Sequence, residues 1–211
     1  MPSLEEYINA KGFLLADGAT GTNLFEMGLQ TGDAPEPWNV DHPDRIERLH
    51  QGFVDAGSDI ILTNTFGGNS CRLKLHKNES RVTEFNVAAA QVARRIADAS
   101  ARNILVAGSM GPTGELFVPM GELTMASATA VFTEQAQALA EGGVDILWVE
   151  TMSSKEEVLA ALAGASTTNL PIVCTLSFDT NGSTMMGLSP TDFAFSSRMT
   201  MSFGNGLKPK S

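Results

Sequence analysis

Two carboxylates stand directly after short apolar runs and could bind a cationic group. Asp17 follows the run at residues 13–16 and opens a loop of glycines and threonines, and Glu150 follows the run at residues 145–149. A carboxylate at such a position is costly to bury unless it meets a cation or a hydrogen-bond donor. An ammonium group on a substrate would meet that need. The plainer alternatives are a capped turn at Asp17 and an internal salt bridge at Glu150.

Three further apolar runs end in loops rich in glycine and hydroxyl groups. These loops span residues 63–69, 108–114 and 177–187. Glycine lets the backbone approach a ligand closely, although each loop alone is also typical of an ordinary turn. The loop at residues 17–22 is not a phosphate-binding P-loop, because it lacks the lysine and the glycine spacing of that motif.

The runs that precede these loops predict five buried strands. They span residues 13–16, 59–63, 104–109, 145–149 and 171–177, and aliphatic residues dominate them without strict alternation, as in strands buried on both faces. Segments with helical spacing lie between them at residues 42–56, 81–101, 124–141 and 153–166; Ser153 or Ser154 could cap the last. This alternation predicts a parallel α/β sheet, either open and doubly wound or closed as a (β/α)8 barrel. In both folds the ligand lies beyond the carboxyl ends of the strands.

Composition indicates a globular, acidic chain. It has 211 residues, of which 43% are hydrophobic, and a net charge of −10, which argues against nucleic acid or an anionic membrane as a partner. The polar N-terminus and the lack of an apolar run of about 20 residues argue against a signal peptide and a membrane span. The two cysteines, Cys71 and Cys174, are interpreted as free buried thiols. We therefore expect a reducing, cytoplasmic environment.

Taken together and in order, the loop motifs resemble the homocysteine S-methyltransferase family. The matching segments are DGATGT at residues 17–22, TNTFGGN at 63–69, GSMGPTG at 108–114, VET at 149–151 and SFDTNGSTMMG at 177–187. The resemblance implies a (β/α)8 TIM-barrel fold, with about the first five to six βα units within residues 1–193. Residues 194–211 show no clean helical or strand period, and we expect them to form an irregular tail. The resemblance also implies that Asp17 and Glu150 bind the amino group of homocysteine. Gly18 would line the site, and Thr63 would lie close by.

The same resemblance implies a zinc ion that binds the homocysteine sulfur and makes a thiolate available to attack a methyl group. In the family three cysteines hold this zinc, one after the sixth strand and two adjacent at the last strand. Neither motif occurs here, and Cys71 and Cys174 do not fall at ligand positions. The histidines, which are His42, His50 and His76, lack metal-ligand spacing and are interpreted as surface or capping residues. We expect no metal ligands in this chain, and no activity from the chain alone.

The methyl donor stays open between a betaine-like compound, a sulfonium compound and methylcobalamin on a corrinoid protein. Trp38 matches a donor-site tryptophan of the betaine enzymes, but Gly67 and Thr151 stand at the tyrosine positions, so an aromatic cage is incomplete. A second copy of the chain is a further candidate partner, since five parallel strands leave open edges. The alternative is a non-catalytic chain that binds an amino acid or a partner chain without zinc. A phosphate-binding barrel is disfavoured, because phosphate sites use later strands.

Overall fold

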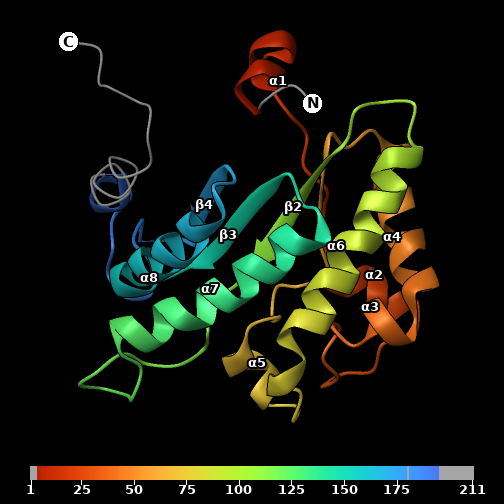
Figure 1. The fold of residues 1–211 in the computed structure, drawn as a ribbon. Helices are drawn as coiled ribbons and strands as arrows, with labels where there is room; N and C mark the ends of the chain where they lie inside the picture. Colours follow the sequence, from red (N-terminus) through yellow and green to blue (C-terminus); the bar gives the residue numbers. More distant parts are fainter. Residues whose placement is uncertain (1–3, 180, 195–211) are drawn as a thin grey trace.

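The computed structural model describes residues 4–179 and 181–194, and its centre is one parallel sheet (Figure 1). The strands are β1 (Ile60–Leu62), β2 (Leu105–Met110), β3 (Ile146–Met152) and β4 (Ile172–Leu176). They lie side by side in chain order, and each neighbouring pair is parallel. A doubly wound sheet instead reverses its strand order at a switch point. The described residues therefore form part of a (β/α)8 barrel, as one of the two alternatives predicted.

The strand predicted at residues 13–16 is reduced to a single parallel bridge between Ala16 and Ile60. The Ile60 N–H donates to the Leu15 carbonyl, and the Asp17 N–H donates to the Ile60 carbonyl. The segment therefore runs along β1 as expected, but it forms no longer ladder. The other four predicted strands are confirmed, with bounds that differ by a few residues. Most of the predicted tail, residues 195–211, lies outside the described residues, and the boundary at residue 193 stays a prediction.

Four long helices match the predicted segments. They are α4 (Pro43–Ala56), α6 (Val82–Ala99), α7 (Met125–Gly142) and α8 (Lys155–Ala165). Helix α7 begins with a capping box between Thr124 and Ser127 and ends at Gly143, whose φ of 93° is left-handed. Helix α8 begins at Ser154, whose side chain accepts a hydrogen bond from the Glu157 N–H. This bond decides between the two predicted caps.

Shorter helical segments were missed by the sequence patterns. They are α1 (Leu4–Lys11), α2 (Thr20–Glu26), α3 (Trp38–Asp41), α5 (Ser70–Lys74) and the 3-10 turns η1 (Glu79–Arg81) and η2 (Ser166–Thr168). Apart from α1, each has seven residues or fewer. Segments of that length contain too few turns to show a helical hydrophobic period.

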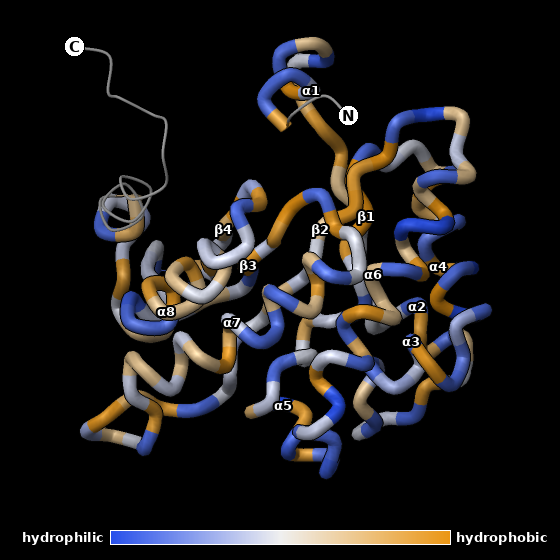
Figure 2. The backbone as a smooth tube through the Cα atoms, in the orientation of Figure 1, coloured by the Kyte–Doolittle hydropathy of each residue, from blue (hydrophilic) through white to orange (hydrophobic). Residues whose placement is uncertain are grey.

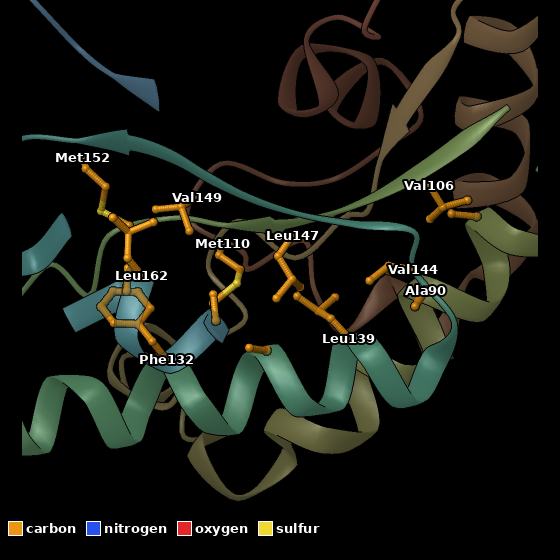
Figure 3. Close-up of a cluster of buried hydrophobic side chains, with 14 of the residues drawn as sticks. Ala90, Val106, Met110, Phe132, Leu139, Val144, Leu147, Val149, Met152 and Leu162 are labelled. Atoms are coloured by element: carbon orange, nitrogen blue, oxygen red, sulfur yellow. The ribbon is translucent and has the colours of Figure 1, made fainter. Parts of the chain in front are cut away.

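Hydrophobic layers lie on both faces of the sheet. On the outer face, Leu147 and Val149 of β3 belong to the cluster that contains Phe132 and Leu139 of α7 (Figure 3). On the inner face, a separate cluster joins Ile60, Leu105, Ala107 and Ile146, with Trp148 packed against it. Since successive side chains of a strand point to opposite faces, Glu150 lies on the inner face with Ile146 and Trp148. Ser109 lies there with Leu105 and Ala107.

Helix α1 packs on the inner face near the amino ends of the strands. Leu4 and Tyr7 pack against the inner cluster, and the Lys11 ammonium lies 2.6 Å from the carboxylate of Asp59, which immediately precedes β1. Figure 2 shows hydrophobic stretches through β1 and β2, whereas hydrophilic residues recur along α4. Each described helix is too short or too polar to cross a bilayer.

We expect Gly142→Ala to lower the free energy of unfolding by about 1–3 kcal/mol, because it overpacks a helix crossing. A Cβ at Gly142 would lie 2.4 Å from the Ala90 Cβ and 2.9 Å from the carbonyl oxygen of Val87, both in α6. Gly52→Ala is the matched control, since Gly52 is exposed within α4 and its Cβ would meet no neighbouring group within 4 Å. That substitution should raise the same free energy by about 0.4–1 kcal/mol.

Urea unfolding followed by far-ultraviolet circular dichroism measures both variants. Equal unfolding midpoints for Gly142→Ala and Gly52→Ala would show that the crossing of α6 and α7 tolerates a methyl group.

Candidate functional site

Asp17 follows the segment that bridges to β1, and Glu150 lies toward the carboxyl end of β3, so both acids are at the carboxyl edge of the sheet. The Asp17 Oδ2 accepts a hydrogen bond of 2.8 Å from the backbone N–H of Leu62, at the end of β1. The Glu150 Oε1 accepts a hydrogen bond from the hydroxyl of Ser109, near the end of β2. The negative charge of Glu150 acts on Asp17, so the two carboxylates are electrostatic neighbours. The structure therefore brings together the two acids that the sequence singled out.

Both carboxylates are harder to ionise than ordinary ones. Partial burial raises the pKa of Asp17 to about 7; the Leu62 N–H opposes the shift and the charge of Glu150 adds to it. Burial also raises the pKa of Glu150, against the hydrogen bond from Ser109. Among residues 4–179 and 181–194, no ion pair joins either acid to a lysine or arginine. The internal salt bridge considered for Glu150 is therefore absent from the described residues, and the pair is suited to a cationic ligand.

The backbone directly after Glu150 is strained. Thr151 has a φ of 62°, and the pairing between β3 and β4 shifts register between Val149 and Met152. A β-branched residue rarely adopts this left-handed conformation, which costs of the order of 1–3 kcal/mol. The register shift interrupts the ladder next to Glu150, so strand pairing alone does not fix the direction of its carboxylate.

Thr63 is buried beside the site and bonded to its neighbours. Its hydroxyl lies 2.6 Å from the Thr65 hydroxyl and accepts a hydrogen bond of 3.0 Å from the Ser109 N–H. The Thr65 hydroxyl donates to the Ser109 carbonyl at 2.7 Å. Thr63 and Thr65 are 3% and 0% exposed, so the protein itself already uses these hydroxyls.

Buried side-chain amides hold the loop at residues 63–69. Gln135 of α7 donates to the Thr65 carbonyl at 2.8 Å, and Asn86 of α6 donates to the Gly68 carbonyl at 2.8 Å. Asn39 of α3 donates to the Asn64 carbonyl at 2.9 Å. Sequence reasoning missed these amides, although a polar residue such as Asn86 within an apolar helix stripe is a visible signal.

Gly18 and Trp38 pack against α4. A Cβ at Gly18 would lie 3.2 Å from the ring of Phe53. Trp38 is 9% exposed, with the Arg45 guanidinium 4.6 Å from its ring centroid and the ring of His42 edge-on at 5.2 Å. A protein cation therefore already covers the ring of Trp38.

The cysteines do not form a zinc site. The sequence contains only Cys71, on α5, and Cys174, on β4, and both are free in the structure. Burial raises the pKa of both thiols, that of Cys174 to about 12, so neither is a ready thiolate ligand. The described residues contain no group of three His, Cys, Asp or Glu side chains placed to hold a metal. The donors present therefore do not fit the tetrahedral zinc site that the resemblance implies.

The interpretation of His50 as a surface or capping residue was wrong. His50 is fully buried in α4, and neither ring nitrogen has a hydrogen-bond partner in the structure. Burial lowers its pKa to about 4, so it is neutral near pH 7. His50 lies on the buried face of α4 together with Ile46, Leu49 and Val54. The helical spacing of these apolar residues in the sequence could have indicated its burial.

Comparisons with known proteins agree with the fold and with the family that the sequence resembles. The family model described as homocysteine S-methyltransferase matches residues 14–204. A methionine synthase of Mycobacterium tuberculosis is 30% identical over 189 residues, which cover 82% of this chain and 16% of that protein. Betaine–homocysteine S-methyltransferase 1 of Rattus norvegicus is 27% identical over 197 residues, 90% of this chain and 46% of that protein.

A solved structure shows the same fold. The metallated form of the homocysteine methyltransferase MmuM from Escherichia coli superposes with a TM-score of 0.81 at 20% identity, covering 93% of this chain and 74% of that chain. This chain thus spans less than half the length of the methionine synthase and the betaine enzyme. The family match, however, extends over most of the 211 residues, and the chain belongs to the homocysteine S-methyltransferase family.

Proposed function

We propose that this chain binds homocysteine through its amino group, as the substrate-binding part of a homocysteine S-methyltransferase. The observation that carries the proposal is the pair of partly buried carboxylates, Asp17 and Glu150, which have no cationic partner among the described residues. An ammonium group provides three N–H donors and a positive charge, so it can compensate both acids at once. Homocysteine carries such an ammonium group, and the reducing cytoplasm that we expect for this chain would keep its thiol reduced.

The role of these residues is to hold the substrate in place. Fixing the amino group orients the rest of the amino acid, and orientation of this kind lowers the entropic part of a reaction barrier. Gly18 belongs to the same loop as Asp17 and lets the backbone approach the ligand. Because the donor set does not fit zinc, we assign no step through the metal to these residues.

The donor side favours a methyl compound other than betaine. Binding of a quaternary ammonium usually requires a free aromatic face. Arg45 covers the ring of Trp38, and Gly67 and Thr151 stand where the resemblance places tyrosines. A sulfonium compound or the methyl group of a corrinoid protein is therefore the better candidate.

A second candidate function is amino-acid binding without catalysis, since the part of the chain that the structure describes has no three His, Cys, Asp or Glu side chains placed to hold a metal. Comparing L-homocysteine with its thiol-free analogue L-2-aminobutyrate separates the two. Binding that ignores the thiol supports the second candidate, and preference for homocysteine supports the first.

We expect Asp17→Asn and Glu150→Gln each to weaken homocysteine binding at least about tenfold, because a charge-assisted hydrogen bond contributes about 1.5–3 kcal/mol. Both substitutions keep the oxygen that accepts from Leu62 or Ser109, so the local fold should persist. Isothermal titration calorimetry at about pH 8 measures the effect. Glu141→Gln, at an exposed position at the end of α7, removes the same charge and is the control. Equal affinities for all variants would exclude this site.

Homocysteine affinity should rise as the pH increases from about 6 to about 8. Burial raises the pKa of Asp17 to about 7, so this acid is largely neutral at the lower pH and ionised at the higher one. Only the ionised form attracts the ammonium group by charge. The ammonium of a free amino acid is more basic than a peptide N-terminus and stays largely protonated over this range. Calorimetry across the range should show a rise that is smaller in Asp17→Asn. A flat profile in the unsubstituted chain would contradict the assignment of Asp17.

The 211-residue chain should retain no stoichiometric zinc. Its two cysteines lie on separate elements, and burial raises the pKa of both thiols. A protein zinc site needs three or four ligands arranged around one point. Inductively coupled plasma mass spectrometry after zinc loading and gel filtration measures the metal content. One tightly bound zinc per chain would overturn this expectation.

A further inference from the structure

The polar groups of Ser109 are all hydrogen-bonded within the protein. Its N–H donates to the Thr63 hydroxyl at 3.0 Å, and its carbonyl accepts from the Thr65 hydroxyl at 2.7 Å and from Gln135 at 3.4 Å. Its own hydroxyl donates to the Glu150 carboxylate. Ser109 is 2% exposed, so water does not compete for these bonds. Hydrogen bonds at both the N–H and the carbonyl therefore fix the backbone of Ser109, and this backbone positions the hydroxyl that bonds to Glu150.

The direction of the Glu150 carboxylate depends on the Ser109 hydroxyl, because regular strand pairing is interrupted next to Glu150. The next residue, Thr151, is left-handed, and the register of β3 against β4 shifts beside it. On the other side, the ladder pairs Ser109 with Trp148, two residues before Glu150 on the same face of β3. The Ser109 hydroxyl is thus the group that holds the Glu150 carboxylate toward β2.

We propose that Ser109 is a positioning residue that aims the Glu150 carboxylate at the substrate amino group. Thr63 acts on the site through the backbone of Ser109, and it does so without touching the substrate. This inference rests on the proposed binding of an ammonium group between Asp17 and Glu150. It assigns the hydroxyls of Thr63 and Thr65 to the support of the site.

The hydrogen bond has an electrostatic consequence that packing alone would lack. A donor to the ionised carboxylate stabilises the charged form, so the Ser109 hydroxyl lowers the pKa of Glu150 while burial raises it. The other titratable group of the site is Asp17, whose ionisation the charge of Glu150 opposes. Ser109 therefore favours the ionised form of Glu150, and the charge it stabilises in turn raises the pKa of Asp17.

The test substitutes Ser109→Ala and measures the 211-residue chain without ligand. Carboxyl carbon NMR should show a higher pKa for Glu150 than in the unsubstituted chain. Ser58→Ala is the matched control, because Ser58 is a similarly buried serine, 4% exposed, two residues before β1 at the opposite end of the strands. It should leave the pKa of Glu150 unchanged. An unchanged pKa of Glu150 in Ser109→Ala would overturn the inference.

The second measurement is calorimetric binding of L-homocysteine as a function of pH. Ser109→Ala should weaken binding about tenfold near pH 7. The loss should shrink as the pH rises, because Glu150 then ionises without the hydrogen bond. A merely structural role would weaken binding by the same factor at every pH, and that result would also overturn the inference.

A second pair of variants keeps the test decisive if Ser109→Ala does not fold. Thr63→Ser keeps the hydroxyl and should bind as the unsubstituted chain does. Thr63→Val keeps the shape, loses the hydroxyl and should raise the pKa of Glu150 in the same direction as Ser109→Ala. Identical pKa values for Glu150 in these two variants would refute the role of Thr63. If the unsubstituted chain does not bind homocysteine, the proposed function fails, whereas the ligand-free NMR still decides the role of Ser109.

Discussion

Buried hydrogen bonds that converge on the loop at residues 63–69 are the constraint on which the rest of the site depends. Amides from α3, α6 and α7 hold the carbonyls of this loop, and its two threonine hydroxyls hold Ser109. A buried polar group without a partner costs about 1–3 kcal/mol. Any other arrangement of the loop that breaks one of these hydrogen bonds would therefore be less stable. The helices that cover the outer face of the sheet thereby control the position of a loop at its carboxyl edge.

The two carboxylates of the site balance the cost of burial against the hydrogen bonds that they accept. Burial disfavours the charged forms of Asp17 and Glu150, and each acid has been given one hydrogen-bond donor in place of a cation. One donor compensates burial only in part, since the pKa of Asp17 still rises to about 7. The buried charges of the two acids are therefore only partly stabilised without ligand. In our proposal the substrate ammonium group supplies the remaining stabilisation when it binds.

The sequence predicted the repeated elements and the two acids, because both follow from local patterns. Buried strands show as aliphatic runs, and a carboxylate after such a run at the carboxyl edge is conspicuous. The strand at residues 13–16 was only partly correct, since hydropathy cannot tell how many residues an edge segment pairs. Ser109 belongs to the GSMGPTG motif at residues 108–114, but the motif does not show its role. That role arises from contacts with Thr63 and Glu150, which are 46 and 41 residues away in the sequence. His50 was misjudged because residue type was given more weight than its place on a helix face.

The strain at Thr151 and the hydrogen bond from Ser109 act on Glu150 from opposite sides. A strained residue persists only where surrounding contacts fix it. Here β3 stays paired with β2 through Val149, and β4 resumes pairing at Met152, so the left-handed residue is confined between two anchored points. The break in the ladder frees Glu150 from the regular pairing with β4, and the Ser109 hydroxyl then selects its direction. Strand geometry alone would place a carboxylate on the inner face, but the bulge and the serine together determine where on that face its charge lies.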